Sequence, residues 1–188
     1  MKTLISSCKL CMLVMVLIPL VIYTQEEISF TAKDPVLITS AGQSADVLMV
    51  KILSKKVGIH YIFEKTATVE FLDSVKSIII VMGGSSKGLG AASIDKENEL
   101  ERVQALMEKA KEKKLPVIGI HVGGKSRRGE LSDYFNKPVA ENADHLIVVK
   151  EGDHDSFFSQ MGKERKIEVQ LPEKINDIQG ILAEIYGK

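Results

Sequence analysis

The chain has 188 residues, and its 25 Lys and Arg residues balance its 25 Asp and Glu residues. Without Lys2 and Lys9 near the N-terminus, 23 basic residues face 25 acidic ones, a net charge of −2. Trp is absent and aromatic residues make up only 5% of the chain, which leaves few platforms for stacking nucleic-acid bases. The composition therefore excludes a general nucleic-acid-binding surface and is typical of one globular domain.

The N-terminal segment has the pattern of an export signal. Lys2 and Lys9 precede an apolar run, Leu10–Tyr23, which an acidic flank follows at residues 25–27. At ~1.5 Å per residue the run spans about 21 Å, too short for a hydrocarbon core of ~30 Å. We expect a signal peptide over residues 1–24, or else an uncleaved N-terminal anchor. In both cases the body is secreted, periplasmic or held outside the cytoplasmic membrane, with no other membrane contact.

Both cysteines, Cys8 and Cys11, lie in this segment. Their C-x-x-C spacing occurs in redox and metal sites, but no strand precedes it and no helix start follows it. We expect no such chemistry here. The exported body would hold together by its core alone.

After a linker at residues 25–34, residues 35–188 form one expected α/β domain, because short β-rich runs alternate with longer amphipathic ones. The expected strands are Val36–Thr39, Ile59–Phe63, Ser77–Met82, Pro116–His121, His145–Val149 and an edge strand Ile167–Leu171. The expected helices are Val47–Val57 (capped by Asp46 and ended by Gly58), a short helix or turn at Val69–Val75, Asp95–Lys113, Leu131–Asn136, Ser156–Arg165 and a C-terminal helix lined by Ile175, Ile178, Leu182 and Ile185. The pattern predicts a three-layer, doubly wound fold with a mostly parallel sheet of five or six strands, flavodoxin-like or Rossmann-like.

The loops after the strands are rich in glycine, serine and basic residues. In open α/β sheets ligands bind beyond the carboxyl ends of the strands, and small residues let backbone N–H groups approach an oxyanion. Four cations on two consecutive loops indicate a small anionic ligand that bears phosphate or carboxylate. The residues expected to bind it are Ser40, Gly42, Gln43, Ser44, Gly83, Gly84, Ser85, Ser86, Lys87, Gly88, Gly124, Lys125, Arg127 and Arg128.

Two other kinds of function stay open at this point. The domain could be a hydrolase or transferase on an anionic metabolite, with Ser85 or Ser86 as nucleophile and His121 as base. However, there is no G-x-S-x-G elbow, no acid is placed to orient the imidazole, and His121 ends an apolar strand, which favours a structural role. The third possibility is a module whose loops engage a partner protein.

Cofactor motifs give no positive indication. Gly84-x-x-x-Gly88-x-Gly90 is similar to the turn of short-chain dehydrogenases, but it follows a mid-chain strand and no Y-x-x-x-K comes after it. The same loop lacks the G-K-[ST] ending of a P-loop. The run Asp153-His154-Asp155 favours helix capping over a metal site, because no second ligand cluster accompanies it. The cofactor is left undetermined and no metal is expected.

Three segments together, Pro35–Lys51, Gly83–Ala92 and His121–Asp133, resemble a family of uncharacterised exported bacterial domains. The resemblance covers essentially the whole chain after the export signal. It implies a Rossmann-like or flavodoxin-like body and a bacterial origin, and it implies no catalytic residues.

Overall fold

In the computed structural model, residues 30–188 are described, so the predicted signal peptide, Cys8, Cys11 and residues 25–29 lie outside the described part. One sheet of six parallel strands runs through the domain in the order β2-β1-β3-β4-β5-β6. The strands are β1 (Val36–Ala41), β2 (Tyr61–Phe63), β3 (Ser77–Met82), β4 (Val117–His121), β5 (His145–Val148) and β6 (Val169–Gln170). The described residues contain no helix with the length and apolarity needed to cross a membrane.

This strand order confirms the doubly wound α/β fold, and the order 2-1-3-4-5 is the flavodoxin-like one, extended here by β6. The chain first moves outward from β1 to β2 and then returns to β3 on the other side of β1. The switch point therefore lies between β1 and β3. In such sheets the loops that leave the two strands diverge there and leave room for a ligand.

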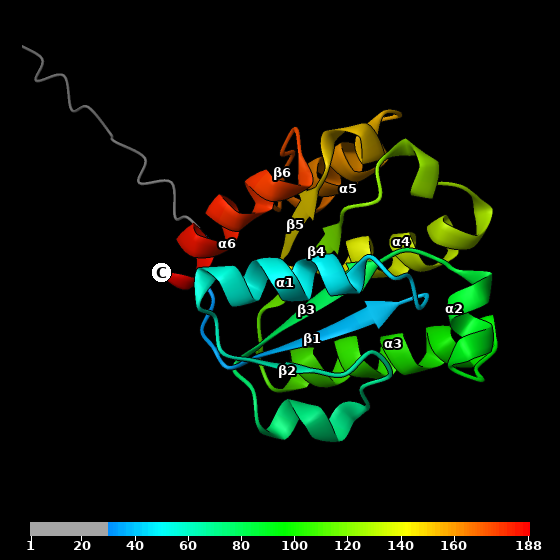
Figure 1. Cartoon of the computed structure of the whole chain (residues 1–188), viewed down its shortest axis with the longest axis horizontal. Coiled ribbons are helices and arrows are strands. Elements are labelled where there is room, and N and C mark those ends of the chain that lie inside the picture. Colours follow the sequence, from blue (N-terminus) through cyan, green and yellow to red (C-terminus); the bar gives the residue numbers. More distant parts are fainter. Residues whose placement is uncertain (1–29) are drawn as a thin grey trace, which may run out of the picture.

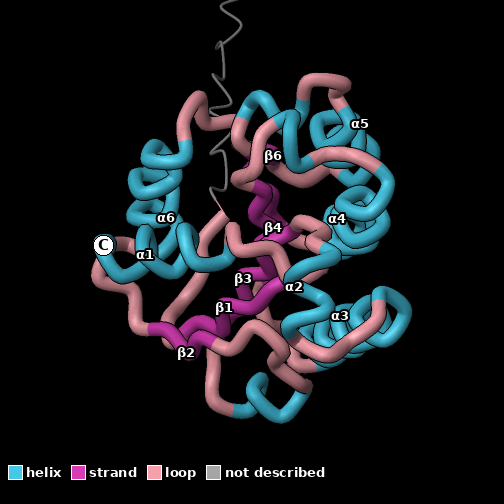
Figure 2. Tube along the Cα trace, turned by 45° about the vertical axis from the view of Figure 1, so that its right-hand side comes forward, coloured by secondary structure: helices cyan, strands magenta, loops and turns pink. Residues whose placement is uncertain are grey.

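Helices cover both faces of the sheet, as Figure 2 shows with the strands seen almost edge-on. One face carries α1 (Val47–Val57) and α6 (Ile178–Tyr186), and the other carries α2 (Ser86–Ala91), α3 (Lys96–Glu112), α4 (Glu130–Asn142) and α5 (Phe157–Arg165). Short 3₁₀ turns lie at Val69–Asp73, Lys125–Arg127, Lys150–Asp153 and Ile175–Asp177. Every residue of β3 is buried, because a central parallel strand has helices on both sides.

Several element boundaries differ from the expectation. The strand expected to end at Thr39 continues to Ala41, since Ser40 and Ala41 pair with the end of β3. The edge strand shrinks to β6. The helix expected near Leu131–Asn136 runs on past Pro138 to Asn142, because Phe135 and Val139 are fully buried in the core and packing outweighs the missing N–H group of proline.

Helix α1 keeps the expected bounds but not the expected cap. Gly58 ends it in the left-handed conformation, with φ of 80°, which favours glycine. Asp46 accepts no capping hydrogen bond from the helix, and its own backbone N–H donates to Ser44 Oγ over 3.2 Å. The prediction that Asp46 caps α1 is therefore wrong.

The end of the predicted linker belongs to the domain. The Phe30 ring stacks on His145 with ring centroids 4.8 Å apart, and Ala32 donates its N–H to the Ile185 carbonyl over 3.0 Å. Asp34 forms an ion pair with Lys188 at 2.9 Å. Residues 30–34 thus pack against the body, and the domain begins before Pro35.

Candidate functional site

The glycine-rich loops converge at one edge of the sheet, beyond the carboxyl ends of its strands (right-hand side of Figure 1). Gln43 and Gly84 form an isolated antiparallel bridge between the loops after β1 and β3. A Cβ at Gly83 would lie 3.7 Å from Asp46 Oδ2, and a Cβ at Gly123 would lie 3.0 Å from the same oxygen. Three loops therefore meet around the start of α1.

The glycines of these loops allow them to pack against one another. A Cβ at Gly88 would lie 2.0 Å from the Gln43 carbonyl oxygen, and one at Gly84 would lie 2.5 Å from the Leu131 oxygen. A Cβ at Gly42 would lie 2.5 Å from the Phe135 ring, and this residue also has φ of 92°. No side chain fits at these contacts. The glycine pattern is thus explained by packing between loops.

The predicted cradle of backbone N–H groups is not free to bind a ligand. Gly42 N–H donates to Glu99 Oε1 over 3.0 Å, and Gly84 N–H donates to Ser132 Oγ over 3.2 Å. Gly88 N–H donates to Ser85 Oγ over 3.0 Å. These donors are already satisfied inside the protein, so the expectation that they bind an anion is corrected.

A buried ion pair that the sequence analysis missed holds this edge together. Glu99 and Arg102 of α3 pair at 2.9 Å, with side chains 0% and 10% exposed. Glu99 also accepts from Gln43 Nε2, and Arg102 donates to the carbonyl oxygens of Ser40 and Ala67. The available signal was that both charged residues fall on the apolar stripe of an amphipathic helix.

Arg128 was expected to attract the ligand, but it is a structural residue. Its side chain is 6% exposed and forms ion pairs with Asp133 at 2.7 Å and with Asp155 at 3.0 Å. The guanidinium also lies over the Phe157 and Phe158 rings. Burial alone would lower the pKa of Arg128, but its carboxylate partners raise it. Its charge is therefore neutralised within the protein.

The other three predicted cations remain available. Lys87, Lys125 and Arg127 are exposed, and none of them forms an ion pair within residues 30–188. Ser86 is exposed beside Lys87. A Cβ at Gly123 would lie 2.2 Å from the Arg127 side chain, so that side chain starts over Gly123. The rim of this edge thus keeps three basic groups without acidic partners in the described chain.

The structure pairs neither Ser85 nor Ser86 with His121, as a serine–histidine hydrolase or transferase would require. The ring nitrogens of His121 face the carbonyl oxygens of Met82 at 3.2 Å and Gly124 at 3.5 Å. Ser85 Oγ is used to cap α2. Burial lowers the pKa of His121, against the opposing effect of the two carbonyl contacts. The structural role that the sequence favours for His121 agrees with this placement.

The remaining predicted ligand residues are buried. Ser40, Gln43 and Ser44 are each at most 1% exposed. Ser44 Oγ accepts from Asp46 N–H, whereas Ser40 Oγ and Gln43 Oε1 have no hydrogen-bond partner among residues 30–188. These three side chains lie inside the loops, and of the three only Gln43 lines the cavity at this edge.

The acidic run after β5 caps a helix, as expected. Asp153 Oδ1 accepts from the N–H groups of Phe158 and Ser159 at the start of α5, over 2.7 and 3.2 Å. Asp155 accepts from Phe157 N–H and from Arg128. Over residues 30–188, no three His, Cys, Asp or Glu side chains are grouped so that they could hold a metal ion.

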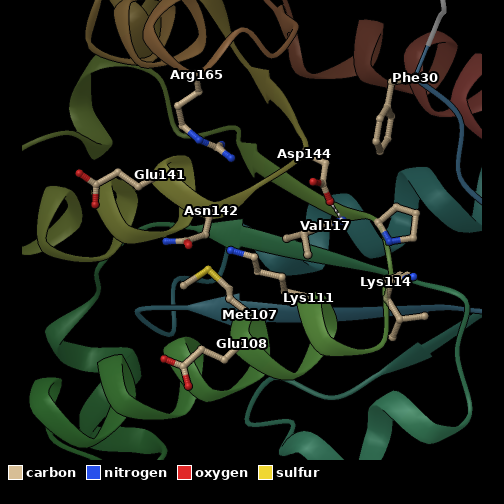
Figure 3. Close-up of a pocket in the computed structure, with 12 residues that line it drawn as sticks. Phe30, Met107, Glu108, Lys111, Lys114, Val117, Glu141, Asn142, Asp144 and Arg165 are labelled. Carbon is tan, nitrogen blue, oxygen red and sulfur yellow. Dashed lines mark hydrogen bonds between the residues drawn. The ribbon is translucent and has the colours of Figure 1, made fainter.

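Two cavities lie at opposite edges of the sheet. The cavity at the carboxyl edge has about 400 Å³ and is lined by Gln43, residues 63–66, Gly88 and residues 91–92. The larger one, about 800 Å³, lies at the amino edge among the ends of α3, α4 and α5 (Figure 3). Ligands of open α/β sheets bind at the carboxyl edge, so the larger volume lies away from the edge that the fold favours.

Strand order and loop placement define this protein as a flavodoxin-like α/β domain with a switch-point edge. The chain belongs to the family described as a domain of unknown function, DUF6305, which matches residues 33–186. A comparison with curated proteins finds no significant match. Among solved structures, the chain is similar to a mutant of the esterase AlinE4, with 9% identity over 71% of this chain and 72% of that chain and a TM-score of 0.30.

Proposed function

We propose that this protein is an exported domain that binds a small hydrophilic anion, bearing phosphate or carboxylate, at the switch-point edge. Lys87, Lys125 and Arg127 would supply the charge. The observation that carries the proposal is that these three exposed cations have no acidic partners in residues 30–188. Lys87 lies in the first turn of α2, directly after the β3 loop, and Lys125 and Arg127 lie in the loop after β4.

The rigid floor under these cations supports the proposal. The bridge between Gln43 and Gly84 joins the loop before Lys87 to the loop after β1, which Glu99 holds through Gly42 and Gln43. A ligand that binds preformed loops loses less free energy to ordering than one that must organise them. Recognition would rest on side-chain cations and the Ser86 hydroxyl, since the N–H groups of Gly42, Gly84 and Gly88 are already used.

Binding of inorganic phosphate and citrate, measured by thermal shift on the full chain, tests this proposal. A ligand at 100 times its Kd stabilises a fold by ~2.7 kcal/mol, so binding should raise the Tm clearly. The double variant Lys87→Ala with Arg127→Ala should lose this shift. Lys55→Ala with Lys56→Ala removes the same charge from the end of α1 and should retain it. Equal shifts in both double variants would contradict the proposed site.

Export is the second part of the proposal. It is supported by Lys2 and Lys9 before the apolar run Leu10–Tyr23, and by the lack of cysteine after Cys11. A phosphatase that folds only outside the cytoplasm, fused after Lys188, should be active. Replacing residues 10–23 with polar residues should abolish that activity, and an active fusion after this change would contradict export by this segment.

A further inference from the structure

We infer that the cavity at the amino edge of the sheet is a second binding site, specific for an organic anion that carries an apolar group. This cavity has about 800 Å³, within the range of small-molecule sites. It lies across the sheet from Lys87, Lys125 and Arg127, so it is independent of the site proposed above.

Two cations point into the cavity. Figure 3 shows the Arg165 guanidinium and the Lys111 ammonium directed toward its middle, from the ends of α5 and α3. Arg165 Nη1 donates to the carbonyl oxygens of Ala140 and Ala143 at the end of α4. These two bonds fix the guanidinium in place, and its other N–H groups make no hydrogen bond within residues 30–188.

The acidic side chains that line the cavity do not neutralise both cations. Glu141 lines the cavity but pairs at 3.3 Å with Lys137, which is not part of the lining. Asp144 accepts from the Val117 N–H over 2.8 Å. Glu108 lies one helical turn before Lys111, but no ion pair joins them, and Figure 3 shows its carboxylate at the periphery. Neither Lys111 nor Arg165 thus forms an ion pair within residues 30–188, and both stay available to an added anion.

One part of the lining is apolar, although Lys114 and Asn142 also line the cavity. Phe30, Met107, Leu115 and Val117 contribute side chains, and Met107 and Val117 are also part of the core. An apolar group placed there would be shielded from water, which would stabilise the complex by about 25 cal/mol per Å² of apolar surface buried. An inorganic anion would leave this wall unused. The cavity thus selects an anion with an attached ring or hydrocarbon chain.

Calorimetric titration of the full chain with 4-phenylbutyrate tests the inference. The carboxylate should bind, whereas 4-phenylbutylamine, with the opposite charge, and acetate, without the ring, should bind at least about tenfold more weakly. Lys111→Met should weaken 4-phenylbutyrate binding by about fivefold or more. Lys109→Met is the control, because Lys109 pairs with Glu112 on the same helix outside the cavity, and it should leave the affinity unchanged.

Equal affinities for the acid and the amine would overturn the inference, as would equal affinities of the Lys111→Met and Lys109→Met variants. The Lys87→Ala and Arg127→Ala double variant separates the two sites. It should lose phosphate binding and keep 4-phenylbutyrate binding, whereas Lys111→Met should keep phosphate binding and weaken 4-phenylbutyrate binding. Loss of 4-phenylbutyrate binding in the double variant would place that ligand at the carboxyl edge and would also overturn the inference.

Discussion

The two edges of the sheet are filled in different ways. At the carboxyl edge, glycine loops pack so closely that a Cβ at Gly88 would lie 2.0 Å from Gln43, and a buried ion pair joins them to α3. At the amino edge, the ends of α3, α4 and α5 leave a cavity of about 800 Å³. The edge that carries the sequence motifs has the smaller cavity, of about 400 Å³, and the edge without motifs has the larger one.

This difference shows that a glycine-rich loop has two possible uses, and that sequence alone does not distinguish them. Glycine permits close approach of any group, whether a ligand or another loop. Here Gly42, Gly84 and Gly88 approach other parts of the protein. The exposed cations beside them remain the reason to expect a ligand at this edge.

The largest expected effect comes from breaking the buried pair at the carboxyl edge. Arg102→Met leaves Glu99 charged and 0% exposed without its partner, and loss of one member of a buried pair costs about 3–5 kcal/mol. Urea unfolding measures this change in the free energy of unfolding. At the amino edge, Lys111→Met should change it by less than about 0.5 kcal/mol. A loss of less than about 1 kcal/mol in Arg102→Met would show that the pair does not hold the carboxyl edge together.

A smaller effect is expected from filling the contact between the loops. Gly88→Ala introduces a methyl group against the Gln43 carbonyl oxygen, and such overpacking costs about 1–3 kcal/mol. Gly90→Ala is the matched control in the same helix, because a Cβ there meets nothing within 4 Å in the described part of the chain. It should stabilise the protein by up to about 1 kcal/mol. Similar midpoints of urea unfolding for the two variants would argue against close packing at this edge.

The smallest effect is the pH dependence of two buried histidines, one at each edge. Burial lowers the pKa of His121, and it also lowers the pKa of His145 against the opposing effects of Gln170 and Glu168. The unfolded chain, with a histidine pKa of about 6.5, therefore binds protons that the folded protein does not. The contribution of the two neutral histidines to the free energy of unfolding should be fully present above about pH 6.5. It should be lost as the pH falls from there through the lowered pKa values.

Each histidine contributes at most about 1.4 kcal/mol per pH unit to this loss. His121→Asn and His145→Asn should each reduce the slope of unfolding free energy against pH between about pH 6.5 and 5. Urea unfolding at a series of pH values measures the slope. An unchanged slope in either variant would show that the corresponding edge does not exclude the charged form of its histidine.

Most of the fold could be predicted because it depends on local patterns. Alternation of apolar runs and amphipathic segments located all six strands, and α1 has the predicted bounds Val47–Val57. The short helix α2 was missed because Ser86–Ala91 contains two glycines, which disfavour helix. The helix forms there because Ser85 caps it and Leu89 is buried.

The site could be predicted only in part. The sequence placed the loops at one edge because parallel strands share a carboxyl edge, and it identified Lys87, Lys125 and Arg127 as basic groups there. It could not distinguish Arg128 from Arg127, although they are neighbours. Arg128 is buried against Asp133 and Asp155, and only the packing of α4 and α5 brings those carboxylates to it.

The sequence by itself determined the class of fold, because hydrophobic periodicity and turn residues act over a few neighbouring positions. It also determined which residue types stand at the switch-point edge. The tertiary structure decided which backbone donors are already used, which cations are neutralised and where a cavity of useful size remains. Those properties depend on contacts such as Gly42 with Glu99, 57 positions apart in the chain, and no local pattern encodes them.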